Sequence, residues 1–226
     1  MRIDKLFLTN NDCYKSGRTI TPQGIVVHST GVNQKKVGVF LKNWNKGGVN
    51  VCVHAFIGVL DDGSIGIVQT LPWNMRCWGV GKGKKGSYNN THIQFEICED
   101  ALKDRAYFDQ VFGLAVKLCA KLCRRYNIPA SSIVSHAEAH RQGYGSNHAD
   151  CDHWLKRFGK TMYDFRWEVQ TYMQVQTTVD NMISDGVTTE PNRESWELFL
   201  NGKAEMNPVF VKTILDRYHD KLEALK

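Results

Sequence analysis

Histidine and aspartate residues gather in one short stretch of the sequence. Four of the eight histidines and two aspartates fall between positions 136 and 153: His136, His140, His148, His153, Asp150 and Asp152. Imidazole nitrogens and carboxylate oxygens are common zinc ligands in catalytic sites. One zinc ion takes only three or four protein ligands, so about half of these histidines must be structural or exposed. The stretch indicates a metal site, and His28, at the end of a distant apolar run, could complete it.

A second candidate for chemistry is Glu96, on a strand expected over residues 91–99. Side chains alternate between the two faces of a strand, so Ile93, Phe95 and Ile97 share one face and Glu96 lies on the other. A carboxylate held there beside an activated water can accept a proton and pass it to a leaving amine. From the residues alone, a surface glutamate without a catalytic role is the simpler interpretation.

The cysteines form an odd set of seven with no CxxC pair. Disulfide-rich proteins are usually short and secreted, with paired cysteines, so we interpret these residues as reduced thiols. Cys119 and Cys123 lie four positions apart on an expected helix and could bind one metal ion. Small core residues are the more common interpretation of such a pair.

The charge of the chain is unevenly distributed. The 226 residues carry a formal net charge of +6, divided into +9 over residues 1–175 and −3 over residues 176–226. A basic body suits a polyanionic partner such as nucleic acid or a bacterial wall polymer, and a solvated basic surface is equally consistent. We disfavour nucleic acid, because the densest basic run, residues 82–85, lies on a glycine-rich loop without interleaved aromatic residues.

The hydrophobic content of 42% is that of an ordinary globular protein. No apolar run approaches the roughly 20 residues of a membrane-spanning helix, and the first residues lack the apolar core of a signal peptide. We therefore expect a protein without a transmembrane segment, synthesised in the cytoplasm without a signal peptide.

Apolar periodicity predicts strands that alternate with helices over residues 1–175. Strands are expected over residues 24–30, 51–60, 64–70, 91–99 and 132–136, with a hairpin at Asp61-Asp62-Gly63. Helices are expected over residues 37–44, 108–126 and 162–175, and residues 137–153 are expected to be irregular. These elements predict an α/β fold, with a mixed central β-sheet flanked by helices.

The C-terminal part of the chain has a different character. Residues 176–192 are predicted to be a linker and residues 193–226 a small helical extension, separate from a domain over residues 1–175. A helix is expected to begin at Asn207-Pro208, because proline suits the first turn. Its apolar stripe is too narrow to be stable alone, so it must pack on the body or pair with a second copy in a homodimer.

Several blocks of the sequence resemble the zinc-dependent N-acetylmuramoyl-L-alanine amidases of the type-2 family. The blocks are GIVVHST (residues 24–30), CVHAF (52–56) with the later Asp62-Gly63, NNTHIQFEICED (89–100), SHAEAH (135–140) and SNHAD (146–150). They occur in the family's order over about residues 1–170, and are most similar to endolysins of phages and prophages of clostridia and related Gram-positive bacteria. The resemblance implies the fold of the peptidoglycan recognition proteins and a bound Zn²⁺.

The resemblance also implies the functional residues: zinc ligands His28, His136 and Asp150, and catalytic residues Glu96 and His148. Glu96 is the implied general base and acid, and His148 the implied hydrogen-bond donor to the oxyanion. Cys151 stands where the family usually has proline. This departure leaves Cys151 as a rival ligand to Asp150, and Asp152 as a weaker one.

The implied substrate is bacterial peptidoglycan, cut between N-acetylmuramic acid and the L-alanine of the stem peptide, which lyses the wall. His54, Trp78 and Lys82 are candidate substrate contacts, while Gly79 stands where relatives often carry histidine, which puts one contact in doubt. By the same resemblance residues 193–226 target the wall, and packing or dimerisation are equally open for them. Release would then depend on a holin or on lysis. The alternative is a non-catalytic peptidoglycan-binding module of the same fold.

Overall fold

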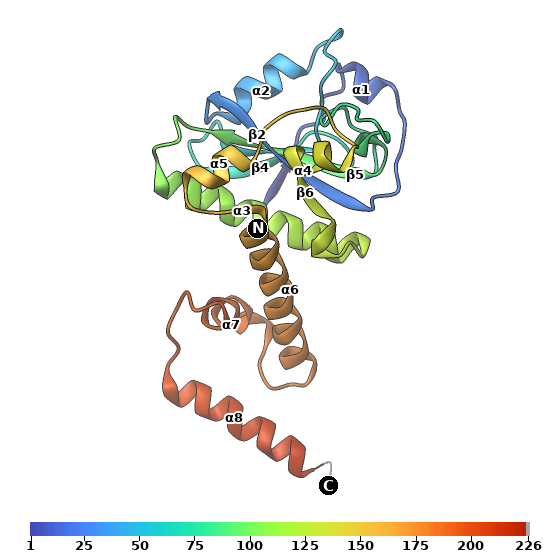
Figure 1. The fold of residues 1–226 in the computed structure, drawn as a ribbon. Coiled ribbons are helices and arrows are strands. Elements are labelled where there is room, and N and C mark those ends of the chain that lie inside the picture. Colours follow the sequence, from blue (N-terminus) through green and yellow to red (C-terminus); the bar gives the residue numbers. More distant parts are fainter. Residues whose placement is uncertain (225–226) are drawn as a thin grey trace. The chain divides into compact units, whose positions relative to one another are not determined.

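The computed structural model describes residues 1–224. The chain divides into two compact units, Met1–Val169 and Gln170–Lys226, and the division falls within one long helix. The first unit contains the whole sheet (Figure 1), and the sequence numbers of all predicted site residues fall within it. The first unit ends at Val169, within the region over residues 1–175 that the sequence predicts to be one domain.

A six-stranded mixed sheet forms the centre of the first unit, which confirms the predicted fold class. The strand order is β1-β4-β3-β5-β2-β6. The strands are β1 (Ile3–Lys5), β2 (Gly24–Asn33), β3 (Ala55–Val59), β4 (Ile65–Gln69), β5 (His92–Glu99) and β6 (Ile133–Ser135). β3 and β4 form the predicted antiparallel hairpin, and the other neighbouring strands pair in parallel.

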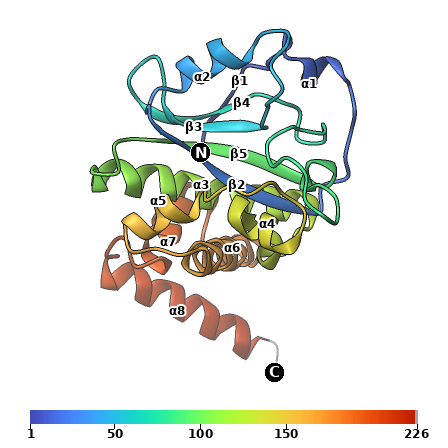
Figure 2. The same cartoon turned by 45° about the horizontal axis from the view of Figure 1, so that its top comes forward.

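Helices cover both faces of this sheet (Figure 2). In the first unit these are α1 (Asp12–Lys15), α2 (Val37–Trp44), α3 (Arg105–Tyr126), α4 (His136–Gln142), α5 (Asp152–Arg157) and the start of α6 (Met162–Ser184). Short 3₁₀ turns are η1 (Tyr88–Asn90) and η2 (Ala130–Ser132). α2 lies on one face, where Phe40 and Trp44 pack on Phe56 of β3 at ring-centroid distances of 5.4 and 4.9 Å. α3 lies on the opposite face (Figure 2).

The long helix α3 begins and ends where its sequence dictates. The Asp104 side chain accepts a hydrogen bond from the backbone N–H of Tyr107, which satisfies a free donor of the first turn. Phe108 and Phe112 belong to the apolar stripe and are buried. Asn127 ends the helix in the left-handed conformation, which asparagine tolerates better than most residues. The predicted amphipathic helix is confirmed.

The alternation in β5 is also confirmed, but both faces of the strand are covered. Ile93, Phe95 and Ile97 are fully buried on one face. On the other face Gln94 is fully buried and Glu96 is half-buried. Strands inside a parallel sheet are covered on both faces, so a polar side chain there must find a partner.

The predicted linker over residues 176–192 is wrong for its first half, because α6 continues to Ser184. Val175, Val179 and Met182 extend the helical apolar stripe and are buried. The rest of the second unit consists of η3 (Glu190–Asn192), α7 (Arg193–Leu200) and α8 (Pro208–Glu223). Its own apolar core contains Trp196 and Ile214. Among residues 1–224, no helix is long and apolar enough to cross a membrane.

Candidate metal centre

The parallel strands β5, β2 and β6 are neighbours in the sheet and bring Glu96, His28 and His136 side by side. His28 of β2 is aligned with Glu96 of β5. Val27 of β2 is aligned with Ser135, the last residue of β6, so His136 follows beside His28. Aligned residues of parallel strands point to the same face of the sheet. The topology thus assembles a candidate site from three distant segments of the sequence.

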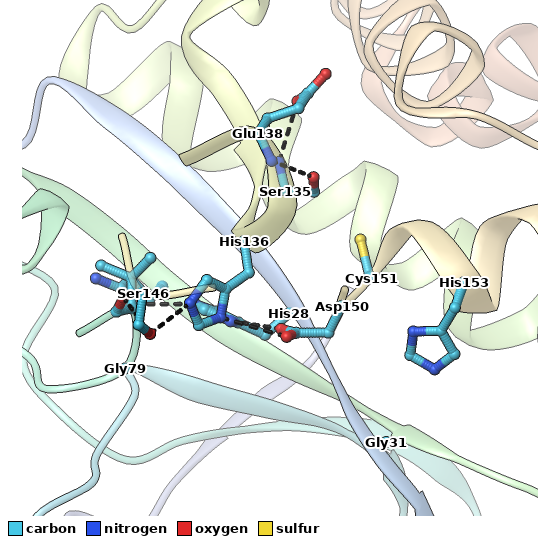
Figure 3. Close-up of polar contacts among 12 residues, drawn as sticks. His28, Gly31, Gly79, Ser135, His136, Glu138, Ser146, Asp150, Cys151 and His153 are labelled. Carbon is cyan, nitrogen blue, oxygen red and sulfur yellow. Dashed lines mark hydrogen bonds and ion pairs between the residues drawn. The ribbon is translucent and has the colours of Figure 1, made fainter. Parts of the chain in front are cut away.

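His136 is the first residue of helix α4, which a capping box holds at the end of β6 (Figure 3). Ser135 Oγ accepts a bond from the Glu138 backbone N–H, and Glu138 Oε2 accepts one from the Ser135 backbone N–H, each at 3.1 Å. Arg166 of α6 donates to Glu138 Oε2 at 2.8 Å and to the Ile133 carbonyl at 3.0 Å. This network corrects the expectation that residues 137–153 are irregular, since residues 136–142 and 152–157 are helical.

Replacing Glu138 with alanine is expected to lower the free energy of unfolding by ~1–3 kcal/mol. The change removes half of the capping box and leaves Arg166 without its carboxylate partner. Denaturant unfolding measures the loss. Glu168→Ala is the matched control, because Glu168 forms a similar ion pair with Lys160 at 2.7 Å that caps no helix. Equal effects of the two variants would contradict the capping role of Glu138.

The carboxylate of Asp150 joins the two histidines (Figure 3). Asp150 Oδ2 lies 2.8 Å from His28 Nδ1, and Asp150 Oδ1 lies 3.3 Å from His136 Nδ1. The Asp150 carbonyl also accepts a bond from the Ala137 backbone N–H at 3.2 Å, which ties its loop to the start of α4. One donor atom from each of His28, His136 and Asp150 lies within 4.8 Å of the others. Two imidazoles and one carboxylate at this spacing form a donor set suited to a catalytic metal ion.

The charge state of Asp150 suits such a site. Burial of the Asp150 carboxylate would raise its pKa, but its close contacts with His136 and His28 outweigh burial and hold the pKa well below its usual range. The group is therefore ionised at neutral pH and supplies a negative charge among nitrogen donors.

Each histidine also has a partner at its other ring nitrogen. Gln94 Oε1 lies 3.0 Å from His28 Nε2, and Ser146 Oγ lies 3.1 Å from His136 Nε2. Hydrogen bonds of this kind orient metal-binding imidazoles. The sequence did not predict either partner; the only signal for Gln94 was its place on the same strand face as Glu96.

Glu96 lies on the strand next to His28 and has no partner for one carboxyl oxygen. Its Oε2 atom is buried without a hydrogen bond. Burial, the Asp150 carboxylate and the Glu99 carboxylate, in that order, raise the pKa of Glu96 well above its usual range. A carboxyl group with a raised pKa and a free oxygen is a candidate general acid or base.

His148, the implied hydrogen-bond donor to the oxyanion, and Cys151, the rival metal ligand, have different surroundings. His148 is exposed, and its ring stacks on His136 with centroids 4.8 Å apart. Cys151 is fully buried, and its Sγ lies 3.9 Å from Met162 Sδ at the start of α6. The thiol thus contacts the core, while the preceding Asp150 faces the two histidines (Figure 3).

The predicted substrate contact at His54 needs correction. His54 is fully buried, and burial lowers its pKa to about 4. Its Nε2 atom bonds to the Met75 carbonyl at 2.8 Å, and its Nδ1 accepts the Gln94 backbone N–H at 2.9 Å. Both ring nitrogens are occupied, so His54 is a structural residue that holds the strand of Gln94 and Glu96.

Gly79 has a structural explanation. A Cβ atom at this position would lie 2.4 Å from Gln94 Oε1 and 3.0 Å from Val53 Cγ1. Gln94 therefore occupies the space into which a side chain at position 79 would extend. A histidine at position 79, which the resemblance implies, is incompatible with the observed contact between Gln94 and His28.

Trp78 and Lys82 line open surface pockets near the histidines. One pocket of about 560 Å³ is lined by both residues together with Arg18 and Arg76. A second, of about 850 Å³, is lined by Lys82, Lys84, Lys85, Arg141 and Ser146 among others. Since Ser146 also contacts His136, the second pocket adjoins the candidate metal centre. Both pockets are basic and suit an anionic ligand.

The other histidines of the stretch have structural partners. His140 Nδ1 lies 3.2 Å from the Gly145 carbonyl, and His153 Nε2 lies 3.0 Å from Glu99 Oε1. These contacts give His140 and His153 a structural role. All seven cysteines are free and buried, as expected of core thiols.

Comparison with known proteins identifies the family. The sequence profile of the N-acetylmuramoyl-L-alanine amidase family (Amidase_2) matches residues 18–153. The N-acetylmuramoyl-L-alanine amidase CwlH of Bacillus subtilis (strain 168) is 31% identical over 139 residues, which are 59% of this chain and 51% of CwlH. The chain thus spans about half the length of this curated relative.

Two solved structures illustrate the similarity of the fold. PlyL has a TM-score of 0.60 and 23% sequence identity, with 75% of this chain and 97% of PlyL covered. A mutant endolysin from Bacillus subtilis has a TM-score of 0.57 and 23% identity, with 75% and 99% covered. Since the profile covers more than half of the chain, including every predicted metal ligand, the protein belongs to the N-acetylmuramoyl-L-alanine amidase family.

Proposed function

We propose that the protein is a zinc-dependent peptidoglycan hydrolase, an endolysin that cleaves the amide bond between N-acetylmuramic acid and the L-alanine of the stem peptide. The observation that carries this proposal is the convergence of His28, His136 and Asp150 beside Glu96. A metal donor set next to a carboxyl group with a free oxygen is the arrangement that metal-assisted amide hydrolysis requires. Family membership supports the same bond and substrate.

The donor set fits zinc. His28, His136 and Asp150 would hold the ion through two nitrogens and a carboxylate, a set that leaves a coordination position for chemistry. When bound, zinc supplies Lewis-acid chemistry, which polarises the amide carbonyl and lowers the pKa of water to about 7.

Glu96 would move the proton of the reaction. Its unpaired Oε2 accepts a proton from the attacking water and then donates it to the departing nitrogen of L-alanine. The products are the lactyl carboxylate of muramic acid and a stem peptide with a free N-terminal amine. The raised pKa of Glu96 makes its ionised form a stronger proton acceptor.

His148 is suited to stabilise the oxyanion that forms at the carbonyl oxygen. It is exposed and lies against His136, so a ring N–H can reach a substrate held at the metal centre. The complete set of His28, His136, Asp150 and Glu96 favours hydrolysis over a non-catalytic wall-binding module of the same fold.

Removal of zinc is expected to stop wall lysis, and its return to restore it. Purified protein should contain one zinc ion per chain by elemental analysis, and a strong chelator should abolish the clearing of purified cell walls. As a control, the chelator-treated protein should still bind the walls, which is measured by the amount of protein that sediments with them. Full lysis by protein shown to contain no metal would contradict the proposal.

The basic pockets are expected to bind the anionic wall. Replacing Lys82 and Lys84 together with alanine should raise KM several-fold, leave kcat nearly unchanged and weaken the inhibition of lysis by salt, because charge attracts substrate before chemistry begins. Lys117→Ala on α3 is the matched control, since Lys117 is exposed and lines neither pocket. Equal kinetics for the double variant and the control would remove the pockets from substrate binding.

A further inference from the structure

We propose that Gln94 and Ser146 are positioning residues of the metal centre. Each accepts the Nε2–H of one histidine and thereby leaves the Nδ1 lone pair of that histidine free for the metal ion. This inference rests on the proposed function because it concerns the same centre. It assigns a role to residues outside the donor set and to the glycine at position 79.

The first hydrogen-bond route runs from the backbone to His28. The backbone N–H groups of Gly79 and Val80 both donate to Asn89 Oδ1 at 3.1 Å, and such groups can only donate. Asn89 must therefore present its oxygen. Gln94 Nε2 donates to the same oxygen at 2.9 Å, which turns Gln94 Oε1 toward His28 Nε2 at 3.0 Å. An amide oxygen accepts only, so His28 Nε2 carries the hydrogen.

The second route runs from the same backbone segment to His136. Ser146 Oγ donates its single hydrogen to the Val80 carbonyl at 3.2 Å, and the Ser146 backbone N–H bonds to that carbonyl at 2.9 Å. With its hydrogen used, Ser146 Oγ acts as the acceptor for His136 Nε2 at 3.1 Å. His136 Nε2 therefore carries the hydrogen as well.

Both routes have the same consequence at Asp150. A neutral imidazole has one N–H and one lone pair, so both lone pairs lie on Nδ1, and both Nδ1 atoms face the carboxylate at 2.8 and 3.3 Å. The two Nδ1 lone pairs and the carboxylate are then placed to act together as ligands of one metal ion. Gln94 is fully buried and His28 is 1% exposed, so water does not readily replace the first route.

The absence of a side chain at Gly79 is needed for the bond between Gln94 and His28, for a steric reason. A Cβ at position 79 would contact Gln94 Oε1, the end of a flexible side chain, at 2.4 Å. The side chain of Gln94 would move before the backbone does, and its bond to His28 would break. An alanine at position 79 should therefore act on the metal centre through Gln94.

The first test compares two substitutions of Gln94 by zinc affinity, measured in competition with a chromophoric chelator. Gln94→Leu keeps the size and removes the acceptor, so the Kd for zinc should rise roughly 10- to 100-fold. Gln94→Glu keeps an acceptor oxygen, so it should bind zinc more tightly than Gln94→Leu. A wild-type Kd in Gln94→Leu would overturn the role of Gln94.

Ser146→Ala tests the second route. This test remains valid even if the Gln94 variants do not fold. The Kd for zinc should again rise roughly 10- to 100-fold, because His136 loses its acceptor. Ser29→Ala is the matched control: Ser29 follows His28, is buried, and its hydroxyl has no partner. Equal zinc affinities in the two alanine variants would overturn the role of Ser146.

A spectroscopic measurement separates positioning from general stability. Nitrogen-15 NMR of the imidazoles should show a protected Nε2–H on His28 and His136 in the zinc-loaded wild-type protein. The His28 signal should lose its protection in Gln94→Leu and keep it in Ser146→Ala, with the reverse for His136. Protected signals for both histidines in both variants would contradict the proposal.

Coupling between positions 79 and 94 gives the last test. Gly79→Ala should weaken zinc binding, and should add little in a Gln94→Ala background, because the side chain it displaces is absent. Additive losses would overturn the coupling. None of these measurements uses cell walls, so failure of the wild-type protein to hydrolyse peptidoglycan would refute the proposed function and leave this inference standing.

Discussion

Glu96→Gln is expected to lower kcat on purified walls roughly 10²- to 10⁴-fold, the usual contribution of a general acid–base group. Glutamine has nearly the same shape but cannot accept or deliver the proton. The zinc content should stay at the wild-type level, because Glu96 is not part of the donor set. Turnover and metal analysis on the same preparation measure both effects. Wild-type turnover in this variant would remove Glu96 from the reaction.

The same variant should gain stability in the metal-free state. The pKa of Glu96 is raised in the folded chain, so the folded chain keeps a proton that the unfolded chain releases as the pH rises above the ordinary glutamate range. The free energy of unfolding of the wild type should therefore fall with rising pH relative to Glu96→Gln. The two proteins should converge in acid, where Glu96 is protonated in both states. Denaturant unfolding at a series of pH values tests this.

Asp150→Ala should abolish both zinc binding and hydrolysis. Asp150 contacts both histidines, and its ionised carboxylate supplies the negative charge of the donor set. Loss of an outer partner alone typically costs 10- to 100-fold in metal affinity, so loss of a ligand should cost more than roughly 100-fold. Zinc titration and wall lysis measure the two effects.

Cys151→Ala is the matched comparison for Asp150→Ala. The Cys151 thiol lies against Met162 and away from the two histidines, so this variant should keep its zinc and lose only stability. Asp152→Asn should also keep zinc, because Asp152 pairs with Arg141. Zinc loss in Cys151→Ala, with retention in Asp150→Ala, would make the thiol the ligand.

Much of the fold could be predicted from local sequence patterns. The period-2 alternation of β5, the hairpin turn at Asp61-Asp62-Gly63 and the apolar stripe of α3 are strong signals, and all three elements are present. Helix α4 was missed because its seven residues carry no apolar stripe. The Ser135-x-x-Glu138 capping signature was the available signal. The linker was misplaced because polar residues around Val179 and Met182 concealed a continuing stripe.

Some residues of the candidate site could also be predicted from the sequence, and others could not. Clustered histidines indicated a metal, and the family resemblance named a ligand set that the structure brings together. The partners Gln94 and Ser146 escaped prediction because tertiary contacts select them: Gln94 lies 66 positions from His28. His54 was misassigned for the opposite reason, since residue type suggests chemistry while burial decides whether a ring can reach a ligand.

Mass spectrometry of the fragments released from purified peptidoglycan tests the central claim most directly. The account predicts stem peptides with a free N-terminal L-alanine, glycan strands with unsubstituted muramic acid, and neither product when a chelator is present. Zinc added back should restore both. Fragments in which L-alanine is still joined to muramic acid, or the same products from protein without metal, would contradict it.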